Sequence, residues 1–165
     1  MIQADIQVEN VKALLSEIPD PEIPVISIAE LGILREVIKV GDKIIVTITP
    51  TYSGCPAMKA IENEIASVLQ ENGITNFEIK YTYSPVWTTD WMNDSAKAKL
   101  RAYGIAPPEN STSDKSVLMV QQKIKTCPRC GSSNTEMISA FGSTACKALY
   151  RCKNCGEPFD YFKCH

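Results

Sequence analysis

The fold is decided by residues 34–73, LREVIKVGDKIIVTITPTYSGCPAMKAIENEIASVLQENG. Leu34–Val40 and Lys43–Thr49 are rich in β-branched residues, and Gly41-Asp42 between them predicts a tight hairpin. The segment Pro56–Asn72 then carries apolar residues at spacings of three and four, which predicts a helix with one buried face. That apolar stripe is formed by Met58, Ile61, Ile65, Val68 and Leu69.

Further elements are predicted on both sides of this stretch. Apolar residues recur at helical spacing over Val8–Ile18, before a proline that ends the helix. Phe77–Tyr83 alternates apolar and polar residues as a strand does, and Asp90–Tyr103 has the pattern of a helix capped by Thr88 or Thr89. The order helix, strand, strand, helix, strand, helix predicts an α+β fold, a two-layer α/β arrangement with helices on one face of a small sheet.

Composition narrows the classes of function. The chain has 165 residues, of which 44% are hydrophobic and 22% charged, and its formal net charge is −2. No global positive charge favours nucleic acid or an anionic membrane as a partner. Apolar runs fall far short of the roughly 20 residues that span a bilayer, and the start of the chain lacks the pattern of a signal peptide. We therefore expect a cytoplasmic protein without a nucleic-acid or membrane partner.

Cysteine is distributed unevenly and indicates two domains. Of the seven cysteines, only Cys55 lies in the first 126 residues, and the others lie between Cys127 and Cys164. The stretch APPENSTSDKS at residues 106–116 has almost nothing to bury, which is typical of a linker. The sequence therefore predicts an α/β domain at 1–105, a linker at 106–116, and at 117–165 a small β-rich module that burial alone would not stabilise.

Two Cys-x-x-Cys-Gly motifs in the second domain predict a metal site. They contain Cys127 and Cys130, then Cys152 and Cys155. Two residues between thiolates let both sulfurs face one ion, and four thiolates describe a structural zinc ribbon with one zinc per chain. A rubredoxin-like iron site uses the same ligands and stays open as the alternative. A closed four-thiolate site has no position for a substrate, so we expect no catalysis by this ion.

The remaining residues of the tail allow several interpretations. Cys146 and Cys164 flank the second motif, in segments that could pair as antiparallel strands. Three interpretations stay open: both cysteines are only small, partly buried residues, they form a second metal site with His165, or they form a redox pair. The aromatic residues of this module form its core or a docking face; they are Phe141, Tyr150, Phe159, Tyr161 and Phe162.

In the first domain, Cys55 is the candidate reactive residue. It is predicted at the start of the Pro56–Asn72 helix, where the helix dipole and free N–H groups favour the thiolate. The alternative is a cysteine that only caps the helix or packs in the core. Three acids of the DPEIPVISIAELG segment are further candidates: Asp20, Glu22 and Glu30. Three roles stay open for them, as metal ligands, as general bases or as turn formers. The single histidine, His165, is the last residue of the sequence, so the chain offers no Ser-His-Asp or Cys-His catalytic set. It also contains no glycine-rich phosphate loop. We therefore expect that the protein is not an enzyme on its own.

Two segments of the first domain resemble a known family. DPEIPVISIAELG and ITPTYSGCPAM are similar to the MIP18-like family, whose members act in iron–sulfur cluster assembly, and the resemblance spans about residues 8–105. With CPRCGS and FGSTACKALYRCKNCGEPFDYFKCH after it, the whole chain resembles the PaaD (or PaaJ) family of the phenylacetyl-CoA 1,2-epoxidase system. The signature positions carried over are Asp20, Pro21, Glu22, Ser27, Glu30, Leu31, Gly32, Thr49, Pro50, Thr51, Cys55 and Pro56.

The resemblance implies an accessory role in aerobic phenylacetate degradation. The chain itself lacks the histidines of a di-iron site and a ferredoxin cysteine run. The implied task is to help assemble a metal centre on the epoxidase or on its flavin reductase, which carries a [2Fe–2S] cluster. The implied partners are these subunits and the iron–sulfur assembly machinery, and a homodimer stays open. The implied cargo is a transient iron–sulfur cluster or iron at Cys55.

Two other functions stay open from the sequence. The chain could be a non-catalytic structural subunit of the oxygenase complex, with the ribbon's aromatic surface as a lasting interface. A thiol enzyme or redox sensor built on Cys55 is the third hypothesis. It is the weakest, because the chain supplies neither a histidine base beside that thiol nor a second cysteine in the same domain.

Overall fold

The computed structural model describes residues 7–109 and 125–163. Contacts divide the chain into two compact units, residues 1–87 and residues 88–165, and the two are taken in turn. No helix of the described residues is long and apolar enough to cross a membrane.

The first unit is built on a three-stranded sheet. The predicted hairpin is confirmed: β1 (Leu34–Val40) pairs antiparallel with β2 (Lys43–Ile48). After helix α2 (Ala57–Glu71), strand β3 (Phe77–Tyr81) pairs in parallel with the other edge of β2. The sheet order is therefore β1-β2-β3, with the most apolar strand in the centre.

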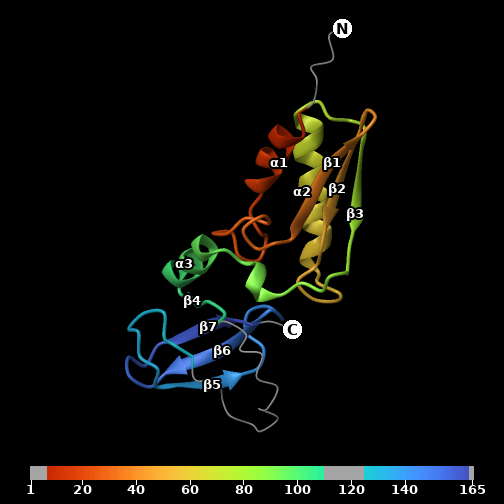
Figure 1. Cartoon of the computed structure of the whole chain (residues 1–165). Helices are drawn as coiled ribbons and strands as arrows, with labels where there is room; N and C mark the ends of the chain where they lie inside the picture. The colour runs from red at the N-terminus through yellow and green to blue at the C-terminus, as the bar shows by residue number, and fades with distance from the viewer. Residues whose placement is uncertain (1–6, 110–124, 164–165) are drawn as a thin grey trace. The chain divides into compact units, whose positions relative to one another are not determined.

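Helices cover one face of this sheet, as the α+β prediction requires. Figure 1 shows α1 (Val8–Ser16) and α2 on the same side of the three strands. Alternate residues of β2 are buried, and so are the apolar stripes of both helices, because each element turns its apolar side to a shared core. Core side chains that are at most 1% exposed include Val11, Leu15, Ile44, Val46, Ile48, Ile61, Ile65 and Leu69.

The predicted helix at Asp90–Tyr103 is interrupted, which corrects the sequence-based expectation. A single 3₁₀ turn, η1 (Thr89–Trp91), is followed by the extended residue Met92, and α3 (Asp94–Tyr103) begins after it. The side chain of Asn93 accepts a 2.7 Å hydrogen bond from the N–H of the third helical residue. Asn93 therefore caps α3, and the two threonines predicted as caps do not.

The second unit contains α3 and a four-stranded sheet with the order β4-β7-β6-β5. Strands β5 (Thr135–Ser139), β6 (Lys147–Cys152) and β7 (Pro158–Phe162) are joined antiparallel. Strand β4 (Ile105–Ala106), which follows α3 directly, pairs in parallel with β7. The last residue of the predicted first domain, Ile105, and the first residue of the predicted linker, Ala106, therefore contribute a strand to the cysteine-rich sheet.

The predicted boundaries at 105 and 116 stay a prediction. Residues 110–116 of the predicted linker lie outside the described residues. The contact-based division falls after Trp87, and it groups α3 and β4 with the ribbon strands.

We expect Ile65→Ala to lower the free energy of unfolding of the first unit by about 2–5 kcal/mol, because this fully buried side chain leaves a cavity between α2 and β2. Urea unfolding followed by tryptophan fluorescence in a Trp91→Phe background measures this, since Trp87 then is the single tryptophan and lies in the first unit. The matched control is Glu64→Ala, an exposed neighbour on the same helix, which should change the value by less than about 0.5 kcal/mol. Equal effects of the two variants would contradict the assigned buried face.

Candidate functional site

Two loops of the second unit carry the four cysteines of the predicted metal site. Cys127–Gly131 precedes β5, and Cys152–Gly156 joins β6 to β7. Each loop closes in the same way: the glycine N–H donates to the carbonyl of the first cysteine, at 3.0 Å in the first loop and 2.9 Å in the second. Both glycines have positive φ, 73° and 79°, which a residue without Cβ adopts readily. The two loops thus hold their cysteines in equivalent positions.

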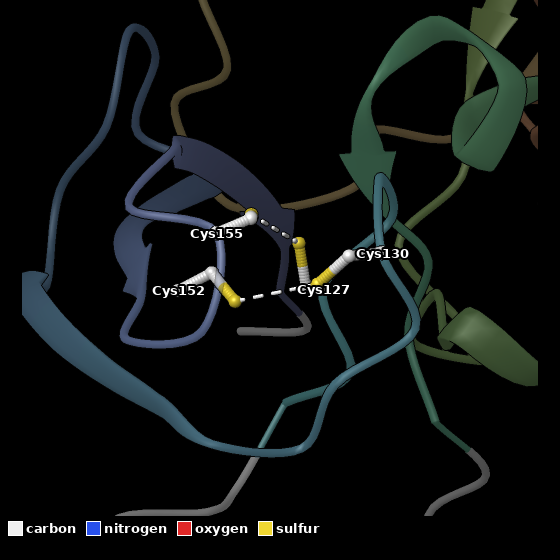
Figure 2. Close-up of side chains that lie close together, drawn as sticks. All are labelled: Cys127, Cys130, Cys152 and Cys155. Carbon is white, nitrogen blue, oxygen red and sulfur yellow. Dashed lines mark hydrogen bonds between the residues drawn. The ribbon is translucent and has the colours of Figure 1, made fainter.

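The four sulfur atoms fit one zinc ion. They lie within 4.8 Å of one another, and Figure 2 shows the side chains directed toward one another from the two loops. Sγ of Cys127 is 3.8 Å from Sγ of Cys155, and Sγ of Cys130 is 3.6 Å from Sγ of Cys152. A disulfide would bring two sulfurs to about 2.0 Å, so these are separate thiols. Zn–S bonds of about 2.3 Å in a tetrahedron place neighbouring sulfurs roughly 3.8 Å apart, which agrees with the observed distances.

The electrostatics of this cluster favour a cation. Backbone N–H groups of Cys155 and Asn154 lower the pKa of the Cys152 thiol to about 7. The Glu157 N–H acts in the same direction on Cys155, but desolvation and the Cys152 sulfur outweigh it and raise the pKa of Cys155 to about 11. Four sulfurs this close cannot all be thiolates without a counter-charge, because like charges repel. A bound divalent ion supplies that charge.

A small apolar core supports the metal loops. Cys127 and Cys152 are buried in it, whereas Cys130 and Cys155 are exposed. The rings of Tyr150 and Phe159 stack there with centroids 5.8 Å apart. The interpretation of the aromatic residues as core holds for Tyr150, Phe159 and Phe162, which are buried, but not for Phe141, which is 64% exposed.

Cys55 lies in the first unit, two residues before α2. Pro56 is the N-cap residue of the helix instead of its first helical residue, so the thiol sits one position farther from the helix than predicted. The thiol is partly exposed and accepts hydrogen bonds from the Ala57 N–H and from the side chains of Tyr52 and Thr51. The loop before the helix therefore surrounds Cys55 with donors.

The pKa of the Cys55 thiol is raised, whereas its place near the start of the helix had predicted a lowered pKa. Burial raises the pKa of Cys55 above its usual value, and the negative charge of Glu22 raises it further. The three hydrogen bonds to the sulfur lower the pKa but do not outweigh burial. At neutral pH the resting residue is therefore a protonated thiol, which disfavours an activated nucleophile.

The acids of the first unit bond mainly to their own loop. Oδ1 of the buried Asp20 accepts N–H bonds from Glu22 at 2.9 Å and from Ile23 at 2.8 Å. Glu30 and Ser27 bond reciprocally: the Ser27 N–H donates to Glu30 Oε2 at 3.0 Å, and the Glu30 N–H donates to Ser27 Oγ at 3.1 Å. Both carboxylates thus act as turn acceptors, and Glu22 is the acid whose charge reaches Cys55.

Across residues 7–109 and 125–163, the single group of three or more side chains placed to hold a metal ion is that of the four ribbon cysteines. Cys55 and the three acids do not form such a group in this part of the chain.

The second predicted thiol site stays a prediction. Cys146 is buried, and its sulfur lies 3.0 Å from Thr144 Oγ1. It directly precedes β6, where its carbonyl accepts the Lys163 N–H at 3.0 Å. Cys164 and His165 lie outside the described residues. The predicted antiparallel pairing of the two flanking segments is confirmed by β6 and β7.

Comparison with known proteins identifies both parts of the chain. Residues 8–73 match the model of the iron–sulfur cluster assembly protein family, and residues 111–163 match that of the PaaD zinc beta ribbon domain. An Escherichia coli protein named as a putative subunit of 1,2-phenylacetyl-CoA epoxidase is 49% identical over 158 residues, which are 96% of this chain and 93% of that protein. The chain belongs to the PaaD family.

Part of this PaaD-family chain is similar to smaller proteins. An "Fe-S protein maturation auxiliary factor" of Porphyromonas gingivalis is 31% identical over 94 residues, covering 56% of this chain and 89% of its own length. The crystal structure of a "Domain of Unknown Function DUF59" from Bacillus anthracis matches with a TM-score of 0.52 and 27% identity, covering 56% of this chain and 90% of that one. The α+β prediction for the first unit agrees with this likeness.

Sequence reasoning missed one part of the Cys55 environment. From the sequence, Thr51 was named only as a signature position without a role, and Tyr52 was not named as a candidate residue. Both side chains bond to the thiol. Their position within four residues of Cys55, in a loop that must turn back before α2, was the available signal.

We expect the purified protein to hold one zinc per chain and Cys152→Ser to lose it, because three thiolates no longer close the tetrahedron. Metal analysis together with amide exchange of β5–β7 measures this, and exchange in the first unit should stay unchanged. Cys146→Ala is the control, since its sulfur belongs to no described metal group. A red protein with iron in place of zinc, or zinc retained in Cys152→Ser, would contradict this assignment.

We expect the alkylation rate of Cys55 to rise with a midpoint above the ordinary cysteine pKa of about 8.5, because burial raises the pKa of this thiol. Glu22→Gln should lower the midpoint, since removing a nearby negative charge stabilises the thiolate. Mass spectrometry of the Cys55 peptide across pH, with zinc bound to protect the ribbon, measures both. Glu17→Gln is the control for a general change in charge, and a midpoint at or below about pH 8.5 would contradict the prediction.

Proposed function

We propose that this PaaD-family protein is an accessory, non-catalytic subunit of a phenylacetyl-CoA epoxidase system in aerobic phenylacetate degradation. Its task is to assist assembly of an iron–sulfur cluster or another metallocentre on a partner subunit. The observation that carries this is the placement of Cys55: a partly exposed thiol, surrounded by donors, in the part of the chain that matches the iron–sulfur assembly family. The same chain carries a PaaD zinc ribbon, which supports the epoxidase system as the context.

Cys55 acts in this proposal as a transient ligand for the cargo, iron or a cluster. A thiol with a raised pKa stays protonated at rest, and it gives up its proton when a metal centre approaches. Asp20 and Glu30 keep the neighbouring loop in shape through their N–H bonds. Glu22 adds negative charge near the thiol. This charge disfavours a thiolate without a bound metal and favours a thiolate that binds a positively charged cargo.

The ribbon has a structural part in this function. Its zinc ion, held by Cys127, Cys130, Cys152 and Cys155, has no open coordination position and fixes the shape of a docking module. The proposed client is the flavin reductase with its [2Fe–2S] cluster, and the proposed source of the cargo is the iron–sulfur assembly machinery.

A structural subunit is the second candidate, and one observation favours it. Met137, Ile138 and Phe141, in and just after β5, are 41%, 53% and 64% exposed. Exposed apolar side chains this near one another along the chain are suited to a lasting interface. Stable co-purification with the oxygenase subunits at fixed stoichiometry would favour this candidate over a transient assembly factor.

We expect the reductase from a strain without this gene to contain less iron and sulfide per chain than the reductase from the parent strain. Wild-type protein should restore both, Cys55→Ala should not, and Cys146→Ala should restore them as the matched cysteine control. Iron and acid-labile sulfide in the anaerobically purified reductase measure the outcome. Full occupancy in the deletion strain would contradict the assembly role, and full restoration by Cys55→Ala would contradict the role of that thiol.

A further inference from the structure

A cavity of 350 Å³ in the second unit has no part in the function proposed above. Described residues that line it come from α3, from β4 and the residues after it, from the segment before the first metal loop, and from β7. Its volume lies within the range of small-molecule pockets, about 300–1,000 Å³. None of the four metal-site cysteines is among its described lining residues.

Three cationic side chains line this cavity. Lys97 and Arg101 are four residues apart on α3 and so share one face of the helix. Lys125 lines it as well, and its side chain is only 4% exposed. The Lys125 ammonium donates to Tyr161 Oη at 3.0 Å, which fixes the cation in the wall. A buried ammonium is costly unless negative charge is near, so this wall favours an anion.

The two acidic side chains that line the cavity do not cancel its positive charge. Glu109 Oε2 is 3.8 Å from Lys125 Nζ, and the Glu109 side chain is 55% exposed. Because Lys125 is buried, Glu109 leaves it at low cost only when another anion takes the place of the carboxylate beside the ammonium. Asp94 lines the cavity at the start of α3, so the five charged side chains among the described lining residues sum to +1 while the Glu109 carboxylate stays in place. When an entering anion displaces Glu109 into solvent, the other four described side chains sum to +2.

The rest of the wall suits an organic body. Ala106, Pro107 and Pro108 contribute apolar surface, and the Tyr161 ring is held edge-on against Tyr150 with centroids 5.8 Å apart. We propose that this cavity binds the phosphate group of a phosphomonoester with a planar or apolar body. A phosphomonoester carries close to two negative charges at neutral pH, which match the cavity better than the single charge of a carboxylate. This inference does not depend on the proposed assembly role.

Isothermal titration calorimetry of the zinc-loaded full chain with AMP, at constant ionic strength, tests this. We expect saturable binding that is tighter for AMP than for inorganic phosphate, because phosphate lacks the organic body. Lys97→Met should weaken AMP binding about tenfold through the loss of one charge-assisted hydrogen bond. Glu109→Gln should tighten it about threefold, since a competing carboxylate is removed.

Lys99→Met is the matched control, because Lys99 is an exposed lysine on α3 that is not among the residues lining the cavity. Its AMP affinity should equal that of the wild type. Arg101→Met serves as a second cation variant, with far-UV circular dichroism and zinc content as checks that the fold is kept. Failure of AMP to bind at millimolar concentration, equal weakening by Lys97→Met and Lys99→Met, or weaker binding by Glu109→Gln would each overturn the proposal. Equal affinity for AMP and inorganic phosphate would overturn the part played by the organic body.

Discussion

The second unit depends on one electrostatic constraint: four cysteine sulfurs lie within 4.8 Å of one another and need a cation between them. The apolar core of this unit is small, and two of those cysteines are part of it. Zinc binding to four-cysteine sites contributes roughly 10–16 kcal/mol, which is comparable to the whole stability of many domains. The fold of this unit therefore depends more on its metal site than on burial in its core.

The first unit depends on burial and contains no comparable cluster among its described residues. Helix α2 turns its apolar stripe into the core of this unit, where Ile61 and Ile65 are at most 1% exposed. Cys55 lies two residues before this helix. Its thiol is partly buried, and burial is the largest effect on its pKa. The protonation state of the candidate site therefore depends on how the surrounding chain covers the thiol.

Features that depend on local sequence were predictable, and those that depend on distant partners were not. The spacing of the metal-binding cysteines and the periodicity of α2 are local signals, and both agree with the structure. The start of α3 was misplaced because an extended residue, Met92, interrupts a pattern that looks continuous in the sequence. The pairing of β4 with β7 joins Ile105 to Asp160, far apart along the chain, which no local pattern reveals. The pKa of Cys55 was misjudged for the same reason, since helix position is local but burial is tertiary.

The two cysteine environments suit opposite tasks. A tetrahedron of four thiolates excludes further ligands and so retains its ion, which is what a structural site requires. A lone, partly exposed thiol with a raised pKa binds a metal only by losing a proton, so its complex is weaker and more easily exchanged. Retention and transfer cannot be optimised at one site, because tight binding slows release. A chain with the proposed function, which keeps one metal and passes on another, therefore needs two separate sites, and the ribbon cysteines and Cys55 lie in separate units.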